Sequence, residues 1–262
     1  MSQPAILRDI PEFRVEVPPS SSIASALAFA QQHLTQGVFN HVARTAYWAL
    51  ILAAKVPPFA DSTLDKESLV LICILHDMGL SFETPQELEG LTTDKRFEID
   101  GANIARDFIR SHVDRDLWDD AKIERLWFAI ALHTTPSIGR HAAPEIALAG
   151  MAVEADFAGP FWSPSPGRAT EAWITVDEYR AVTALFPRVD FNRNGVKKLM
   201  CGLCQRKPDT TYDNFVGLFG VKYGVDGEGG GRIEYARHWE ENQAYLHLLG
   251  GLDALETLDS SS

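Results

Sequence analysis

The sequence is poor in cysteine and in long apolar runs. Only 3 of its 262 residues are cysteines, too few to cross-link a chain of this size, which fits a reducing compartment. No apolar run approaches the roughly 20 residues needed to cross a bilayer, and the opening MSQPAILRDIPEF lacks the layout of a signal peptide. We therefore expect a cytoplasmic protein, with the nucleus as the other compartment that fits.

Basic residues are outnumbered, with 24 Lys and Arg against 36 Asp and Glu and a formal net charge of −12. A surface of that sign repels phosphate backbones and anionic headgroups, which argues against nucleic acid and membrane partners. A local basic pocket would still admit a phosphorylated compound. The expected partner is a small-molecule substrate, and a homo-oligomer is compatible with an enzyme of this size.

Strand-like alternation is rare as well, whereas apolar residues recur at spacings of three and four, which is typical of helices. The segments that we predict to be helical are 23–35, 39–55, 65–78, 99–111, 118–133, 144–158, 175–186 and 234–250. The fold class predicted from this pattern is all-α, a multi-helix bundle.

Domain organisation follows from composition. Residues 1–22 hold four prolines, which favours an extended arm over a helix. Residues 23–250 contain no repeat and no obvious linker, so we expect a single helical domain there. Residues 251–262, which end in LDSSS, are expected to form a flexible tail.

The segment 65–78, DKESLVLICILHDM, places a polar pair in an apolar setting. It opens with acidic residues suited to a helix N-terminus, and Gly79 follows as a C-terminal signal. Its second half is apolar nearly all round, which predicts a buried helix. His76 and Asp77 would then be buried, which is costly unless they are paired, hydrogen-bonded or bound to a metal.

Further candidate ligands lie elsewhere in the chain. His41 follows Asn40, a plausible helix N-cap, and Asp156 lies within the apolar segment EIALAGMAVEADFAG. Two imidazoles and two carboxylates suit zinc, iron, manganese or nickel and leave room for water or substrate. Each residue alone also fits a satisfied core position.

The order of these residues, His41, then His76 and Asp77 in LHDMG, then Asp156, resembles the signature of the HD superfamily of metal-dependent enzymes. The resemblance implies an HD-type bundle around one buried divalent metal, with His41, His76, Asp77 and Asp156 as its ligands. Zn²⁺ is the expected ion, with Fe²⁺, Mn²⁺ and Ni²⁺ as alternatives.

Longer stretches resemble the fungal cyanamide hydratase branch of that superfamily, whose members add water to cyanamide to give urea. These stretches are FNHVARTAYW, LHDMGL, RFEIDGANIARDF, ALHTT, EADFAGP and CQRKPDTTYDNFVGLFG. The resemblance implies a metal-dependent hydro-lyase acting on a small nitrile-type substrate. The alternatives are an HD-type phosphohydrolase, for which Lys95 and Arg96 would neutralise phosphate, an iron oxygenase, and a metal-stabilised binding protein without catalysis.

The number of metals is predicted from what stands before Gly101. Two-metal HD proteins carry a histidine a few residues before a Gly-Ala, where this chain reads RFEIDGA, with Phe97, or its neighbours Arg96 and Glu98, in place of the histidine. One metal is therefore expected. His112, His133 and His141 remain as substitutes for the missing ligand.

A divalent metal lowers the pKa of bound water towards about 7, and attack on a nitrile also requires a proton donor. His133, in LWFAIALHTT, is the candidate donor, and Asp77 would orient the water while ligating the metal. Alternatively, His133 is a further ligand or a partner of a ligand carboxylate. Thr134 and Thr135 would add hydroxyls to the pocket or cap a helix end.

Two other sequence features give weaker indications of function. Cys201 and Cys204 have the spacing of half a zinc knuckle, but no second pair lies nearby, so we interpret them as ordinary thiols. Several aromatic residues would wall an apolar pocket or fill the core. They are Trp118, Trp127, Phe128, Phe157, Phe161 and Trp162, of which Phe161 and Trp162 are expected to face substrate.

Overall fold

The computed structural model describes residues 5–57, 59–61, 63–84, 88–113, 117–163 and 172–260. These residues form α-helices and short 3-10 helices, and the one extended pairing among them is an isolated bridge between Ile10 and Val15. The predicted all-α fold is confirmed. Over the same residues, no helix combines the length and apolar character needed to cross a membrane.

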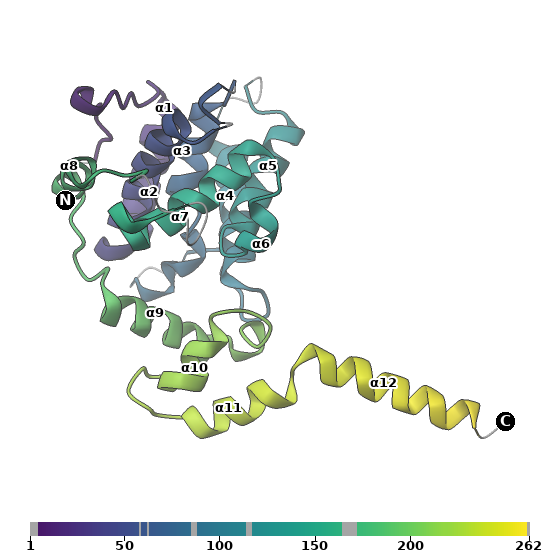
Figure 1. The fold of residues 1–262 in the computed structure, drawn as a ribbon. Coiled ribbons are helices and arrows are strands. Elements are labelled where there is room, and N and C mark those ends of the chain that lie inside the picture. Colours follow the sequence, from purple (N-terminus) through teal and green to yellow (C-terminus); the bar gives the residue numbers. More distant parts are fainter. Residues whose placement is uncertain are drawn as a thin grey trace. The chain divides into compact units, whose positions relative to one another are not determined.

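The chain divides into two compact units, one of Met1–Leu91 with Phe97–Phe191 and one of Thr92–Arg96 with Asn192–Ser262. Unit 1 contains α1 (Ser21–His33), α2 (Gln36–Lys55), α3 (Lys66–Leu75), α4 (Phe97–His112), α5 (Asp120–Leu132), α6 (Pro136–Gly139), α7 (Pro144–Ala158) and α8 (Val176–Leu185) (Figure 1). Unit 2 contains α9 (Arg193–Arg206), α10 (Gly217–Tyr223), α11 (Arg232–Glu241) and α12 (Ala244–Asp259). The domain boundaries expected from the sequence stay a prediction.

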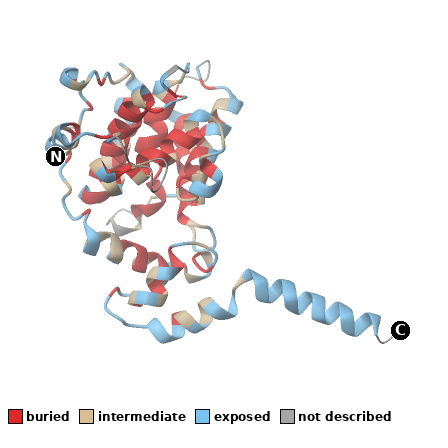
Figure 2. Ribbon diagram, in the orientation of Figure 1, coloured by how far each residue is buried: buried red, intermediate tan, exposed pale blue. Residues whose placement is uncertain are grey.

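The core of unit 1 is built around α3, whose residues from Ser68 to Leu75 are all buried. Asp65 caps this helix by accepting a hydrogen bond from the Ser68 N–H at 3.0 Å. Helix α2 packs against α3 and α7, and α5 packs against α4 and α7. Figure 2 shows that buried residues concentrate in these central helices. The apolar segment ending in His76 and Asp77 therefore lies in the interior, as the sequence predicts.

Helix α2 begins earlier than predicted, at Gln36, with Thr35 as its N-cap. The interpretation of Asn40 as a cap is wrong, because this residue lies inside the helix and its side-chain amide donates to the Pro187 carbonyl at 2.7 Å. His41 consequently lies in the second turn of α2.

Helix α3 ends at Leu75, three residues before the predicted end, with His76 as its C-cap. Met78–Glu83 then form a 3-10 helix, η3. Gly79 does not end α3. A Cβ at this position would collide with the Phe97 carbonyl, so the glycine permits the close approach of η3 to α4.

In unit 2, helices α9 and α10 were not predicted, and the predicted helix 234–250 is divided between α11 and α12. The Cys201 and Cys204 sulfurs lie 3.9 and 3.4 Å from the carbonyl oxygens of Phe219 and Val216, and neither cysteine forms a disulfide. Helix α12 has no buried residue and is exposed along its length (Figure 2).

Candidate metal centre

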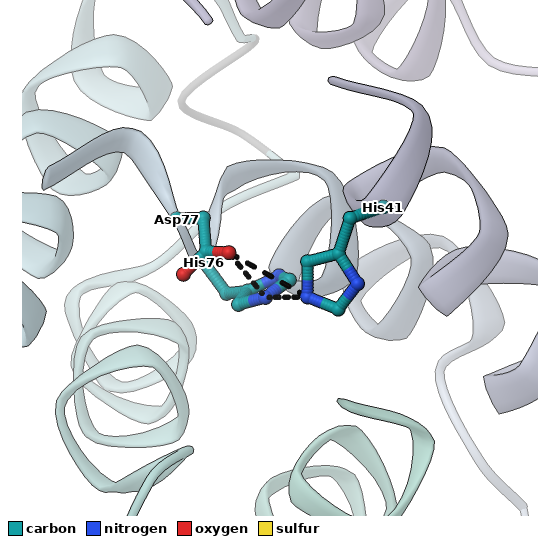
Figure 3. Close-up of side chains that lie close together, drawn as sticks. All are labelled: His41, His76 and Asp77. Atoms are coloured by element: carbon teal, nitrogen blue, oxygen red, sulfur yellow. Dashed lines mark hydrogen bonds and ion pairs between the residues drawn. The ribbon is translucent and has the colours of Figure 1, made fainter. Parts of the chain in front are cut away.

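Three buried side chains from two parts of unit 1 converge in its interior (Figure 3). His41 comes from α2, His76 caps the C-terminus of α3, and Asp77 is the next residue. Their relative exposures are 1%, 1% and 5%. One ligand atom from each lies within 4.8 Å of the other two, and among the described residues this is the one such group of three or more His, Cys, Asp or Glu.

The three ligand atoms form a nearly equilateral triangle. His41 Nε2 and His76 Nε2 are 3.3 Å apart, and Asp77 Oδ2 lies 3.5 Å from the first and 3.3 Å from the second. The point equidistant from all three is about 1.9 Å from each, close to the roughly 2.0–2.2 Å of Zn–N and Zn–O bonds. The donors therefore fit a zinc-sized ion placed near their common centre.

Hydrogen bonds at the opposite ring nitrogens set the tautomer of both imidazoles. His76 Nδ1 lies 2.8 Å from the Cys73 carbonyl oxygen, and His41 Nδ1 lies 2.7 Å from Asp156 Oδ2. Both partners accept hydrogen bonds, so each Nδ1 carries a proton, and in the neutral form of each ring Nε2 keeps its lone pair. Two lone pairs that face each other repel unless a cation lies between them, which is a second reason to place a metal here.

The charge states also suit a metal. Burial lowers the pKa of His76, against the opposing effect of Asp77, which favours the neutral ring that a metal requires. Burial acts to raise the pKa of Asp77, but its interactions with His76, His133 and His41 outweigh that effect and hold the pKa well below its usual value. Asp77 is therefore an ionised acceptor.

His133, at the C-cap of α5, lies on the other side of Asp77. Its Nε2 is 3.5 Å from Asp77 Oδ1, and its Nδ1 is 2.6 Å from the Ile130 carbonyl oxygen. Burial acts to lower its pKa, but Asp77 and Glu98 outweigh that effect and the pKa is raised. The structure thus brings the predicted proton donor next to the group of three, while leaving it outside that group.

Asp156, the fourth ligand implied by the resemblance, is fully buried in α7, and the structure does not bring it into the group of three. Its carboxylate contacts the Nδ1 side of His41 instead of the Nε2 side. Burial acts to raise the pKa of Asp156, but hydrogen bonds from Arg44 and His41 outweigh it and keep the carboxylate ionised. Its role as a metal ligand stays a prediction.

Aromatic rings surround the centre. Phe191 stacks on His41 with ring centroids 4.3 Å apart, Phe157 lies 5.5 Å from the same ring, and Phe97 lies 5.7 Å from His133. Phe157 was among the predicted pocket residues. Phe161, also predicted there, is 91% exposed, whereas Trp162 is buried with its indole N–H 3.3 Å from Glu154.

The remaining predicted aromatic residues serve other contacts in unit 1. Trp118 is buried with the Lys122 ammonium over its ring, Trp127 donates to Asn103 at 3.0 Å, and Phe128 is partly exposed. Of the three candidate substitute ligands, His133 lies beside Asp77 as described above, whereas His112 stacks on Phe108 and His141 is exposed.

Glu98 is a site residue whose role the sequence did not suggest. It is buried in the first turn of α4 and accepts a hydrogen bond from the Thr134 hydroxyl at 2.5 Å. Acidic residues are common in the first turn of a helix, where they interact favourably with the helix dipole. The position of Glu98 in the sequence therefore gave no sign of a role in the site. With Asp77, it places a second carboxylate near His133.

Residues 38–159 match the family model of the HD domain. The matched range contains His41, His76, Asp77, His133 and Asp156. This part of the chain is therefore similar to an HD domain, which agrees with the buried group of two histidines and one aspartate. A search of curated proteins found no match to this chain.

Proposed function

We propose that the HD domain at residues 38–159 binds one divalent metal, Zn²⁺ in the first instance, and adds water to a small uncharged nitrile. Cyanamide, with urea as product, is the reference substrate. The observation that carries the proposal is that the two carboxylate oxygens of Asp77 have different neighbours. Oδ1 faces His133, whereas Oδ2 belongs to the triangle of ligand atoms with His41 and His76.

The reaction needs no oxidant or reductant. The oxygen of one water bonds to the nitrile carbon and ends as a carbonyl oxygen, both π bonds of the C≡N group break, and both protons of that water finish on the nitrile nitrogen. When bound, a divalent metal supplies Lewis acidity and lowers the pKa of water towards about 7. His133 Nε2 is the ring nitrogen that faces the centre, because Nδ1 is bonded to Ile130, and it is placed to pass a proton to the nitrile nitrogen.

The charges beside the centre support an uncharged substrate. Arg44 binds both oxygens of Asp156 and the carbonyl oxygens of Phe186 and Pro187. Arg188 also binds Asp156 and the Tyr179 hydroxyl. These guanidinium groups are engaged by protein acceptors, whereas binding of a phosphate would require donors directed at the substrate.

The HD domain match is equally consistent with a phosphohydrolase. Lys95 and Arg96 are the residues that would serve that alternative, and Arg96 lies 4.0 Å from Asp213. The aromatic rings around His41 and His133 favour a small neutral compound instead.

The test is urea production from cyanamide by the purified protein, before and after chelation and after Zn²⁺ is restored. We expect urea formation that chelation abolishes and zinc restores. The same preparations are offered a panel of nucleotides and small phosphate esters. Metal-dependent release of phosphate without urea would replace the hydratase by the phosphohydrolase, and no turnover of either class would leave a metal-stabilised binding protein.

A further inference from the structure

The carboxylate of Asp156 is surrounded by donors. Its Oδ1 lies 2.8 Å from Arg44 Nε, 2.7 Å from Trp48 Nε1 and 3.3 Å from Arg188 Nη2. Its Oδ2 lies 2.8 Å from Arg44 Nη2 and 2.7 Å from His41 Nδ1. The Asp156 side chain is fully buried, so these protein groups replace water as its partners.

An ionised carboxylate offers about four lone-pair sites in its plane. Five donors already approach the two oxygens of Asp156, three at Oδ1 and two at Oδ2. A metal ion that bound this carboxylate would have to displace at least one of them. Displacing Arg44 would be the costliest choice, because it would leave a fully buried guanidinium without its counter-charge.

The same contacts fix the orientation of His41. Asp156 accepts the hydrogen bond from His41 Nδ1–H, and Phe191 stacks on the ring face with centroids 4.3 Å apart. The Nε2 atom of His41 therefore points toward His76 and Asp77. Arg44 follows His41 by three residues on α2, so one helix carries both the ligand and the group that holds its carboxylate partner. A carboxylate behind a metal-bound histidine fixes its tautomer and increases its basicity as a ligand.

We propose that Asp156 is a positioning residue, which orients His41 through Nδ1, and not a fourth ligand of the metal. The protein then supplies three ligands, His41, His76 and Asp77, and leaves the remaining coordination positions to water and substrate. Arg44, Trp48 and Arg188 hold the Asp156 carboxylate in place. This inference rests on the metal centre of the proposed function and is independent of the substrate.

Zinc affinity distinguishes the two roles. Competition against a chromophoric chelator would be measured for the wild type, Asp156→Asn, and His76→Ala as the reference for a lost ligand. Asp107→Asn, an exposed Asp-to-Asn change on α4, is the matched control. We expect Asp156→Asn to bind zinc about 10- to 100-fold more weakly and still to saturate at one zinc per chain. The control should bind as the wild type does.

Loss of the saturable site in Asp156→Asn, as complete as in His76→Ala, would overturn the inference, and so would unchanged affinity. A wild type that binds no zinc would overturn the metal centre itself, whereas a wild type that binds zinc but makes no urea would overturn the substrate alone.

A measurement on the wild type covers the case in which Asp156→Asn does not fold. A crystal structure of the zinc-loaded protein should retain the His41–Asp156 hydrogen bond, with both Asp156 oxygens outside ligation distance. An Asp156 oxygen at about 2.0–2.2 Å from zinc would contradict the proposal.

Discussion

His41 Nε2 and His76 Nε2 face each other across 3.3 Å in the interior of unit 1, although 35 residues separate them in the sequence. Each ring donates its Nδ1–H to an acceptor, so in the neutral rings both of the facing Nε2 atoms carry a lone pair. Asp77 adds a negative oxygen to the same point. This arrangement is stable with a cation at the centre, and its cost without one leads to the first prediction.

Removing the metal should lower the stability of unit 1. A ligand present at 100 times its dissociation constant stabilises the native state by about 2.7 kcal/mol, so chelation should reduce the melting temperature by several degrees. Differential scanning calorimetry before and after dialysis against a chelator would measure the change. His76→Ala serves as the control, since its melting temperature should not respond to chelation. Equal melting temperatures for the wild type with and without chelator would count against the buried site.

Replacing His133 by Ala should remove turnover and leave the metal bound. His133 lies outside the group of three and faces Asp77 at 3.5 Å, so its loss removes a proton donor and no ligand. The expected decrease in kcat is about 10²- to 10⁴-fold, with zinc content close to one per chain. Unchanged urea production would show that His133 is not the donor, and loss of zinc would show that it is a ligand.

Gly79→Ala should disturb the packing of η3 against α4. The added methyl would meet the backbone carbonyl of Phe97, which cannot move without shifting α4. We expect a loss of about 1–3 kcal/mol in the free energy of unfolding and weaker zinc binding, measured by denaturant titration and chelator competition. The matched control is Gly250→Ala in the exposed helix α12, where an added Cβ has no neighbour within 4 Å. If Gly79→Ala behaves like this control, the close approach of η3 to α4 contributes neither to stability nor to zinc binding.

The three thiols should be unreactive in the native protein. Each is at most 1% exposed. Burial raises the pKa of Cys73 far above its usual value and that of Cys201 to about 11, so little thiolate forms at neutral pH. Mass spectrometry after iodoacetamide treatment should find no modification in the native state and three modified cysteines in denaturant. Rapid native modification of Cys201 or Cys204 would indicate a reactive pair and contradict their interpretation as ordinary core thiols.

The sequence predicted those parts of the metal centre that lie within one short segment of the chain. The apolar run before His76 identified a buried helix, and the polar pair that follows it identified a site. The boundaries of α7 were predicted as observed, since Pro144 begins it and Gly159 follows it.

The rest depended on residues far apart in the sequence. The partners of Asp156 include Arg44, 112 positions away, and Trp48, 108 positions away, so no local pattern distinguishes a ligand from a carboxylate held behind one. Helix α9 was missed because its glycines lower its helix propensity, and its stability depends on packing of its apolar face.

The central claim is a metal held by His41, His76 and Asp77. Its most direct test is the zinc content of the purified protein and of two histidine variants after equilibration with Zn²⁺ and removal of unbound ion. The wild type and His112→Ala, whose ring lies against Phe108, should each retain about one zinc per chain, and His76→Ala should retain none. Equal zinc in all three proteins, or none in the wild type, would contradict the account.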